Sequence, residues 1–173
     1  MAATAILGAI VKTVGLKGEV KLNPGPDFWP DALGAKSLDL RFGDAVERTV
    51  RVTGCRPSGR AFVLRLEGIE TIEKAQPLVG RSVTVDLDSL GEVAVPERAL
   101  PCQFIGLTVR LADGSTLGTV VDLLLGPAQD CLIIERDGER YLVPNVPGLM
   151  LRQNLDEGFI EIDPPKGLLD LRY

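Results

Sequence analysis

The sequence predicts an all-β fold made of two small β-barrel domains. It contains 19 glycines and 12 prolines among 173 residues, and such a proportion favours many turns and short strands over long helices. Apolar and β-branched residues occur in short runs that glycine-containing turns interrupt, which is typical of strands. A chain of this length can hold one large domain or two small ones, because domains average about 150 residues.

The first half begins with a hairpin signal. Residues 5–14 are mostly apolar and end at Gly15-Leu-Lys-Gly18, after which residues 19–22 resume the pattern. This predicts two strands and a tight turn in which both glycines adopt positive φ angles. Thr71 is expected to cap a short helix over residues 71–76. The other strands expected in this half are 37–41, 46–54, 60–66 and 81–86.

The second half carries two further hairpin signals, Asp113-Gly114 and Asp137-Gly138. The apolar tail over residues 167–171 is expected to dock against this domain. These signals predict a second β-barrel. The strands expected in this half are 104–111, 116–122, 131–136, 139–143 and 159–163.

Charge divides the chain in the same way. Residues 1–86 carry 12 basic and 10 acidic side chains, whereas residues 87–173 carry 7 basic and 14 acidic ones. Between them, a stretch with two prolines and weak periodicity is typical of a linker. We therefore expect a barrel over residues 1–86, a linker over 87–101 and a second barrel over 102–173. The acidic half would repel RNA and attract a basic protein.

Several function classes are disfavoured by composition. Histidine is absent, which removes imidazole as a general base, a metal ligand or an activator of a nucleophile. Cys55, Cys102 and Cys131 are odd in number and form no closely spaced pair, so we expect reduced thiols without a disulfide or zinc. No apolar run is long enough for a membrane helix, and no basic residue precedes the first apolar stretch. A cytoplasmic protein without catalytic, cofactor or metal site is expected.

Basic residues are concentrated in one stretch. Residues 48–65 contain five arginines and no acidic residue. Strand periodicity places Arg51 and Arg65 on outward faces and Arg56 near a turn, as a phosphate-contacting surface requires. The alternative is the solvated face of an edge hairpin, where charge discourages aggregation. The candidate RNA contacts are Lys17, Arg51, Arg56 and Arg65.

Several motifs in series resemble one known family. Residues 6–21, with Gly-Leu-Lys-Gly-Glu-Val at 15–20, resemble the N-terminal signature of the bacterial ribosome maturation factor family RimM. Residues 66–80 resemble the segment that follows in that family. The second half is similar to the PRC-barrel domain of the same family. The similar stretches there are 104–107, 117–120, 128–134, 141–144, 162–164 and 167–169.

This resemblance implies a non-enzymatic assembly factor with a translation-factor-like barrel followed by a PRC barrel. It implies binding to the head of the immature small ribosomal subunit, contact with the nineteenth small-subunit protein, and assistance in 16S rRNA maturation through local rRNA contacts. It implies no cofactor and no membrane, and we expect a monomer.

One departure from the family concerns the partner site. Family members often have a tyrosine pair where this chain has Ala99 and Leu100. Leu100 and Phe104, together with Asp130, are the candidates for contacting the protein partner, although Asp130 has an alternative role as a turn cap. Two other functions stay open. One is a scaffold for a small ligand or a membrane-associated complex, since PRC barrels also occur in photosynthetic reaction centres; the other is an enzyme with Cys102 as nucleophile.

Overall fold

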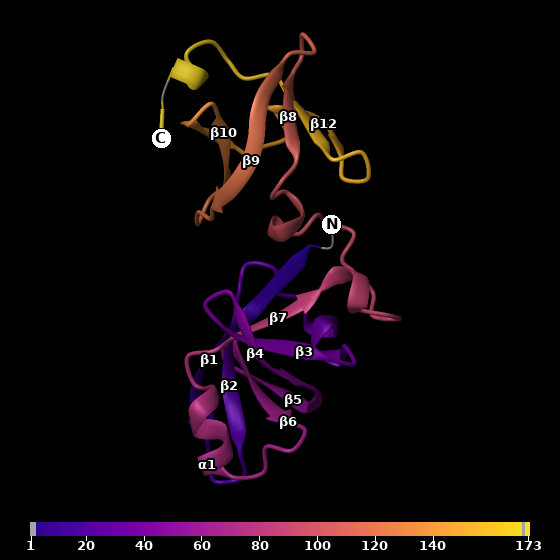
Figure 1. The fold of residues 1–173 in the computed structure, drawn as a ribbon, viewed down its shortest axis with the longest axis vertical. Helices are drawn as coiled ribbons and strands as arrows, with labels where there is room; N and C mark the ends of the chain where they lie inside the picture. The colour runs from indigo at the N-terminus through magenta and orange to yellow at the C-terminus, as the bar shows by residue number, and fades with distance from the viewer. Residues whose placement is uncertain (1–2, 171) are drawn as a thin grey trace. The chain divides into compact units, whose positions relative to one another are not determined.

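The chain folds into two compact units, Met1–Cys102 and Gln103–Tyr173, here termed the N-terminal and C-terminal units. The computed structural model describes residues 3–170 and 172–173. Each unit is built around one sheet, and only short helices connect the strands (Figure 1). The predicted all-β class with two barrel domains is therefore confirmed.

The N-terminal unit contains a seven-stranded sheet in the order β4-β3-β7-β1-β2-β6-β5, in which all pairs are antiparallel. Its strands are β1 (Thr4–Val14), β2 (Glu19–Pro24), β3 (Leu38–Phe42), β4 (Ala45–Val50), β5 (Val52–Ser58), β6 (Ala61–Leu66) and β7 (Ser82–Asp86). Its short helices are η1 (Pro30–Gly34), α1 (Ile72–Ala75), η2 (Gln76–Leu78) and η3 (Leu87–Ser89).

The predicted turn between β1 and β2 is confirmed. Gly15 and Gly18 have φ angles of 62° and 76°, in the region that side chains disfavour. Gly18 is constrained a second time, because a Cβ built on it would lie 2.5 Å from the carbonyl oxygen of Ile69. The predicted cap is also present, since the Thr71 hydroxyl accepts a hydrogen bond from the backbone N–H of Lys74.

The single strand predicted over residues 46–54 is wrong. β4 ends at Val50 and pairs with β3, whereas β5 begins at Val52 and pairs with β6. Arg51 lies between them, and its carbonyl accepts a hydrogen bond from Glu67 N–H at 2.9 Å. Residues 46–54 therefore form parts of the two edge strands, β4 at one end of the sheet and β5 at the other. Hydrophobic periodicity alone does not reveal such a break.

The segment predicted as a linker packs on the N-terminal unit. Leu90 and Leu100 belong to its hydrophobic core, and Trp29 Nε1 donates a hydrogen bond to the carbonyl of Ala94 at 2.9 Å. The buried carboxylate of Asp27 accepts hydrogen bonds from the backbone N–H groups of Ile6 and Cys102, both at 2.8 Å. These contacts hold the segment against β1 up to the last residue of the unit.

The C-terminal unit contains a six-stranded sheet in the order β11-β10-β9-β8-β13-β12. Only the β13–β8 pair is parallel among the described strands. Apolar side chains of β8, β9, β10, β11 and β13 form its core. The strands are β8 (Thr108–Leu111), β9 (Thr116–Leu124), β10 (Cys131–Arg136), β11 (Glu139–Pro144), β12 (Met150–Asn154) and β13 (Phe159–Ile162).

Three details of this unit bear on the sequence predictions. The first strand begins at Thr108 and not at residue 104, because residues 104–107 form a turn. In this turn the carbonyl of Phe104 accepts a hydrogen bond from Leu107 N–H at 3.1 Å. β12 was not predicted. Within the predicted tail, the short helix η5 (Leu168–Asp170) contacts β11, as expected. Beyond that tail, Arg172 forms a bridge with Tyr141 on β11, and Tyr173 N–H donates to the carbonyl of Arg140 at 2.9 Å. Residue 171 of that predicted tail lies outside the described residues.

Candidate functional site

A basic face covers the outer side of β1, β2, β6 and β5 in the N-terminal unit. Val20 and Leu22 on β2 are buried, so the alternate residues Glu19 and Lys21 lie on the opposite side of the sheet. Lys12 of β1 lies directly across from Lys21. The basic face consists of Lys12, Lys21, Arg56, Arg60 and Arg65, with Glu19 among them.

Glu19 holds the two arginines of this face together. Its two carboxylate oxygens accept hydrogen bonds from Arg56 at 3.1 Å and from Arg65 at 3.2 Å. These bonds, from Arg56 first and Arg65 second, hold the pKa of Glu19 below its ordinary value. The arginine side chains remain 55% and 60% exposed. Because each uses one N–H group on Glu19, the other guanidinium donors face solvent and are available to a phosphate.

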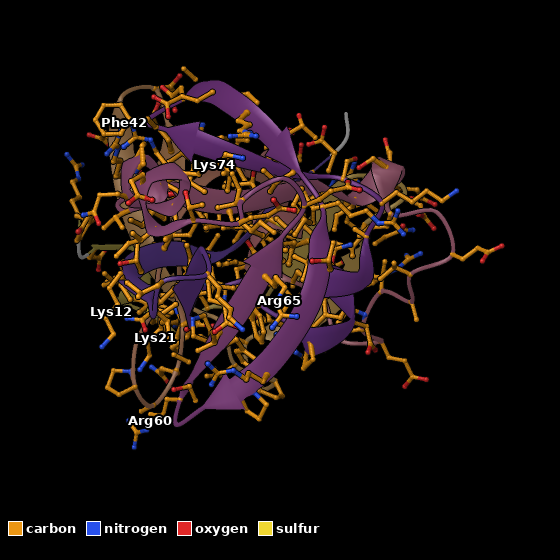
Figure 2. All side chains as sticks on the ribbon, turned by 90° about the horizontal axis from the view of Figure 1, so that it is seen from below. Lys12, Lys21, Phe42, Arg60, Arg65 and Lys74 are labelled. Carbon is orange, nitrogen blue, oxygen red and sulfur yellow. The ribbon has the colours of Figure 1, made fainter. Side chains whose placement is uncertain are left out.

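The basic face rests on a small apolar base. Val63 of β6 lies opposite both Lys21 and Arg56, yet it is only 3% exposed. Long cationic side chains at such positions can cover an apolar neighbour with their aliphatic stems while their charged ends stay in solvent. Figure 2 shows Lys12, Lys21 and Arg60 directed outward from the strands. Strand β6 therefore has buried side chains on both faces, since Val63 on its outer face is buried as well.

The structure brings together only part of the predicted RNA-binding set. Arg56 and Arg65 meet at Glu19. Lys17 is exposed in the β1–β2 turn and lines a hollow of about 430 Å³ with Arg65, but two glutamates line the same hollow. Arg51 is exposed between β4 and β5 and does not belong to the basic face.

Sequence reasoning missed two members of the basic face, Lys12 and Lys21. Their pairing can be found by counting residue pairs away from the glycine turn. Val14 pairs with Glu19 and Thr13 with Val20, so the next pair is Lys12 with Lys21. A register shift between Ile10 and Lys12 interrupts the regular alternation of β1. The sequence alone therefore does not show which side chains of β1 face the core and which face solvent.

The C-terminal unit presents an acidic surface. It carries 11 acidic and 6 basic residues, and five of its six cations are engaged within the unit. Arg110 and Arg152 lie over the ring of Phe159, with 4.5 and 5.4 Å from guanidinium carbon to ring centroid. The remaining three engaged cations form the ion pairs Arg136–Asp137, Arg140–Glu135 and Arg172–Glu139.

The carboxylates that remain are spread over exposed turns and strand ends. Exposed acidic residues without an ion pair among the described contacts of this unit are Asp113, Asp122, Asp156, Glu157, Asp163 and Asp170. Since 11 acidic residues outnumber 6 basic ones and three of those cations are already paired with carboxylates, the outward field of this unit is negative. A basic partner is the kind of molecule that such a surface attracts.

The three predicted contacts for the protein partner occupy different environments. Leu100 is fully buried in the core of the N-terminal unit, so it offers no surface here, and this placement corrects its candidacy as a contact. Phe104 is buried as well, with 5% of its surface exposed, so the same correction applies to it as a contact. Asp130 Oδ1 accepts a hydrogen bond from Gly126 N–H at 3.3 Å, which is the turn-capping role considered as the alternative. Ile105, next to Phe104, is 46% exposed and was not singled out from the sequence.

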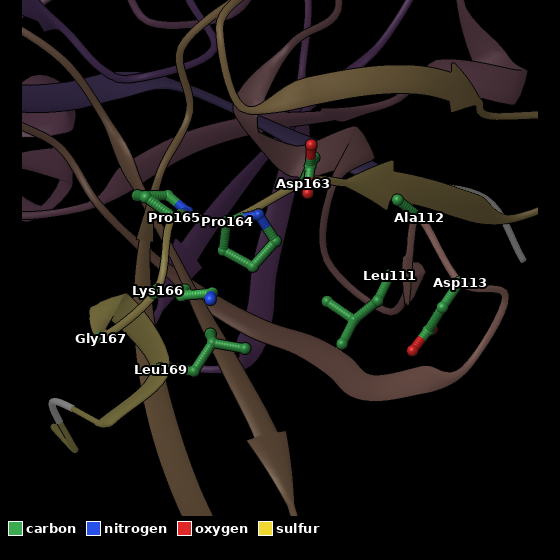
Figure 3. A pocket seen from close by; sticks show the side chains of 9 residues that line it. All are labelled: Leu111, Ala112, Asp113, Asp163, Pro164, Pro165, Lys166, Gly167 and Leu169. Carbon is green, nitrogen blue, oxygen red and sulfur yellow. The ribbon is translucent and has the colours of Figure 1, made fainter.

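A shallow hollow in the C-terminal unit offers no converging functional groups. It measures about 340 Å³ and lies between the β8–β9 turn and the segment that contains Pro164, Pro165 and Lys166 (Figure 3). Asp113 at its rim is occupied, because both the N–H and the hydroxyl of Ser115 donate to its carboxylate and lower its pKa. This arrangement resembles a capped turn more than a binding pocket.

Neither an activated Cys102 thiol nor a metal-binding cluster is found among the described residues. Burial, with a smaller effect of Asp27, raises the pKa of the half-buried Cys102 thiol to about 12, so the thiol stays protonated near neutral pH. Over residues 3–170 and 172–173, no group of three Cys, Asp or Glu side chains is placed to hold a metal ion. Within that same part of the chain, no helix is long and apolar enough to span a membrane.

The fold and its surfaces define a two-domain β protein with a basic face on one unit and an acidic surface on the other. Residues 5–90 match the profile of the RimM N-terminal domain, and residues 101–168 match that of the RimM PRC barrel domain. The chain belongs to the RimM family.

Two relatives that match over nearly their whole length support this assignment. The ribosome maturation factor RimM of Synechococcus sp. WH7803 is 36% identical over 169 residues, and the match covers 95% of each chain. The corresponding protein of Synechococcus sp. CC9605 is 35% identical over 170 residues, again with 95% of each chain covered.

Two solved structures are also similar to this chain. A 16S ribosomal RNA processing protein RimM from Pseudomonas aeruginosa matches 94% of this chain and 98% of its own, with 22% identity and a TM-score of 0.46. The N-terminal domain of RimM from Thermus thermophilus matches 50% of this chain and 93% of its own, with 18% identity and a TM-score of 0.41.

Proposed function

We propose that this protein is a non-enzymatic assembly factor for the small ribosomal subunit. The acidic C-terminal unit binds a basic protein of the subunit head, the nineteenth small-subunit protein, and the basic face of the N-terminal unit contacts nearby 16S rRNA. The protein acts in the cytoplasm as a monomer and assists rRNA maturation by binding, without covalent chemistry or a cofactor.

The single observation that carries this proposal is the separation of charge between the two units. Five of six cations in the C-terminal unit are used internally, whereas Arg56 and Arg65 share only one carboxylate and stay more than half exposed. A ribonucleoprotein offers a basic protein next to a polyanion, and two oppositely charged surfaces in one chain match that combination.

The mechanism follows from differential affinity. A binding protein shifts an equilibrium only if it binds one state better than the other. This factor therefore stabilises an immature arrangement of protein and rRNA and leaves when the mature arrangement binds it less well. Equal affinity for immature and mature subunits contradicts this mechanism.

Apolar area for the protein contact comes from Ile105 in place of the family's tyrosine pair. Ala99 and Leu100 stand at the tyrosine positions, and Leu100 is buried in the core. Ile105 is exposed at the start of the C-terminal unit, and an exposed apolar side chain on an acidic unit suits a basic partner with an apolar centre.

Cosedimentation with immature and mature small subunits tests the proposed function. The full chain and a fragment of residues 103–173 are compared at low and moderate salt. We expect preference for immature particles, retained in part by the fragment and weakened by salt. The matched variants are Ile105→Ser, which should weaken the association, and Leu151→Ser, which removes another exposed apolar side chain of the same unit and should not. Failure of the full chain to associate with either particle contradicts the proposal and favours the scaffold function.

A further inference from the structure

A second hollow in the N-terminal unit lies along an unpaired strand edge. It measures about 590 Å³, and the four consecutive residues Val52–Cys55 of β5 form one side. Helix η1, with Asp31 and Leu33, and the segment Glu92–Ala94 form the other sides. The hydrogen bond from Trp29 Nε1 to the Ala94 carbonyl fixes that segment next to the helix. One side of the hollow is therefore a strand, and the segment that forms another side is held in place by a hydrogen bond.

The outer edge of β5 is not paired with any other described strand. β5 is last in the strand order, and β6 is its one partner strand in the described sheet. Among the described residues, no further backbone hydrogen bond joins β5 to another segment. Pro57 has no backbone N–H to donate, and it is tolerated in β5 because one side of an edge strand forms no hydrogen bonds to a neighbouring strand. An edge of this kind accepts an extended peptide through main-chain hydrogen bonds, while neighbouring pockets select its side chains.

The lining of the hollow selects for cationic and apolar side chains. Two exposed carboxylates, Asp31 and Glu92, stand on separate walls, and no lysine or arginine is among the lining residues. Leu33, Val52 and Val93 supply apolar surface. Alternate residues of a bound strand point to opposite sides, so a segment that alternates basic and apolar residues matches this lining.

We propose that the β5 edge binds an extended, lysine- or arginine-rich segment of a protein partner by strand addition. The segment pairs with Val52–Cys55 and places its cations at Asp31 and Glu92. The outer face of the same strand carries Arg56, so a basic segment at the edge and RNA on the face are bound side by side. The assignment of the segment to a ribosomal protein rests on the proposed function, but peptide binding itself does not.

A fluorescein-labelled peptide of about ten residues that alternates lysine and valine is the probe, and fluorescence anisotropy with the full chain is the measurement. The test variant is Asp31→Lys/Glu92→Lys. The matched control is Asp44→Lys/Glu70→Lys, which makes the same change in net charge at exposed carboxylates outside the hollow. A second peptide of the same sequence carries N-methyl groups on alternate residues, which removes the main-chain donors needed for strand addition.

We expect the test variant to bind the peptide about tenfold more weakly and the control variant to bind it within about twofold of the parent protein. The N-methylated peptide should lose most of the affinity. Backbone amide NMR shifts should change over Val52–Cys55.

The proposal is wrong if both variants weaken binding equally, if the N-methylated peptide binds as tightly as the unmodified one, or if the shift changes fall within residues 103–173. It is also wrong if the β5 edges pair two copies of the chain, which sedimentation would show as a dimer. Because this assay needs no ribosome, it separates the failure of this proposal from the failure of the assembly function.

Discussion

The two units reach opposite surface charge by different means. The N-terminal unit carries 13 basic and 13 acidic residues, so its net formal charge is zero, whereas the C-terminal unit has an excess of five acidic residues. The basic face exists because strand register gathers Lys12, Lys21, Arg56 and Arg65 on one side of a sheet. The acidic surface exists because the C-terminal unit has 11 acidic and only 6 basic residues, and five of those basic residues are engaged within the unit.

This comparison shows that net charge is a poor guide to a binding surface when a unit is close to neutral. The pairing of charges decides what a partner meets. In the N-terminal unit Glu19 binds two arginines. In the C-terminal unit three arginines each pair with a separate carboxylate, and two others share the ring of Phe159. The two units differ in surface charge, and we expect them also to unfold independently and to differ in RNA binding.

The largest expected effect concerns two glycines, one in each unit. A Cβ on Gly18 would lie 2.5 Å from the Ile69 carbonyl oxygen, and one on Gly118 would lie 2.4 Å from the Glu135 carbonyl oxygen. Each alanine substitution should reduce the free energy of unfolding by about 3 kcal/mol. If the units unfold separately, Gly18→Ala lowers one urea transition and Gly118→Ala the other.

Gly15→Ala is the matched control, because Gly15 has a similar positive φ angle but no atom within 4 Å of the added Cβ. It should cost about 1–2 kcal/mol. A single transition that both Gly18→Ala and Gly118→Ala shift equally would contradict separate unfolding of the two units.

The next effect tests which unit holds the segment that precedes Cys102. Asp27→Ala leaves the N–H groups of Ile6 and Cys102 without their acceptor, which should destabilise the N-terminal unit by about 2 kcal/mol. Amide hydrogen exchange should speed up at Cys102 and leave the C-terminal strands unchanged. Asp31→Ala, which removes an exposed carboxylate, is the control and should have no measurable effect. Unchanged exchange at Cys102 would mean that the segment is held by other contacts.

A smaller effect is expected for RNA binding by the basic face. Arg56→Gln/Arg65→Gln should weaken binding to a 16S rRNA fragment about tenfold at low salt and reduce the slope of log affinity against log salt by about 1 per arginine. Arg136→Gln/Arg140→Gln removes the same charge from the C-terminal unit and should leave the slope unchanged. Titrations at several salt concentrations measure both slopes, and equal losses in the two double variants would remove the distinction between the surfaces.

The sequence predicted those features of the fold that local chemistry determines. The β1–β2 turn needs two glycines with positive φ angles, and the helix needs a hydroxyl at Thr71, so both were identified from residue type. The break at Arg51 was missed because it depends on which distant strands β4 and β5 pair with. The packed segment up to Cys102 was missed because its anchors, Asp27 and Trp29, lie more than 60 residues earlier in the chain.

The candidate sites divide in the same way. Arg56 and Arg65 were predicted from an arginine-rich stretch without acidic residues, yet Glu19, which organises them, comes from the preceding hairpin. Leu100 was predicted as a contact because it is apolar and stands at a family position, but apolar character does not distinguish a core residue from an interface residue. That distinction requires knowledge of burial.

The smallest expected effect concerns the pH dependence of the Glu19 ion pairs. Hydrogen bonds from Arg56 and Arg65 hold the pKa of Glu19 below 4.5 in the folded N-terminal unit. A carboxyl whose pKa is lower in the folded state contributes stability above its unfolded pKa and loses it as pH falls through the folded value. Glu19→Gln should therefore lower the urea midpoint slightly at pH 7, and this loss should shrink as the pH falls through the lowered pKa of Glu19 and the parent carboxyl becomes protonated. Glu135→Gln in the C-terminal unit, with one arginine partner, is the comparison. A loss from Glu19→Gln that stays the same as the pH falls would mean that the two arginines do not stabilise the charged carboxylate, and the basic face would then lack its organising charge.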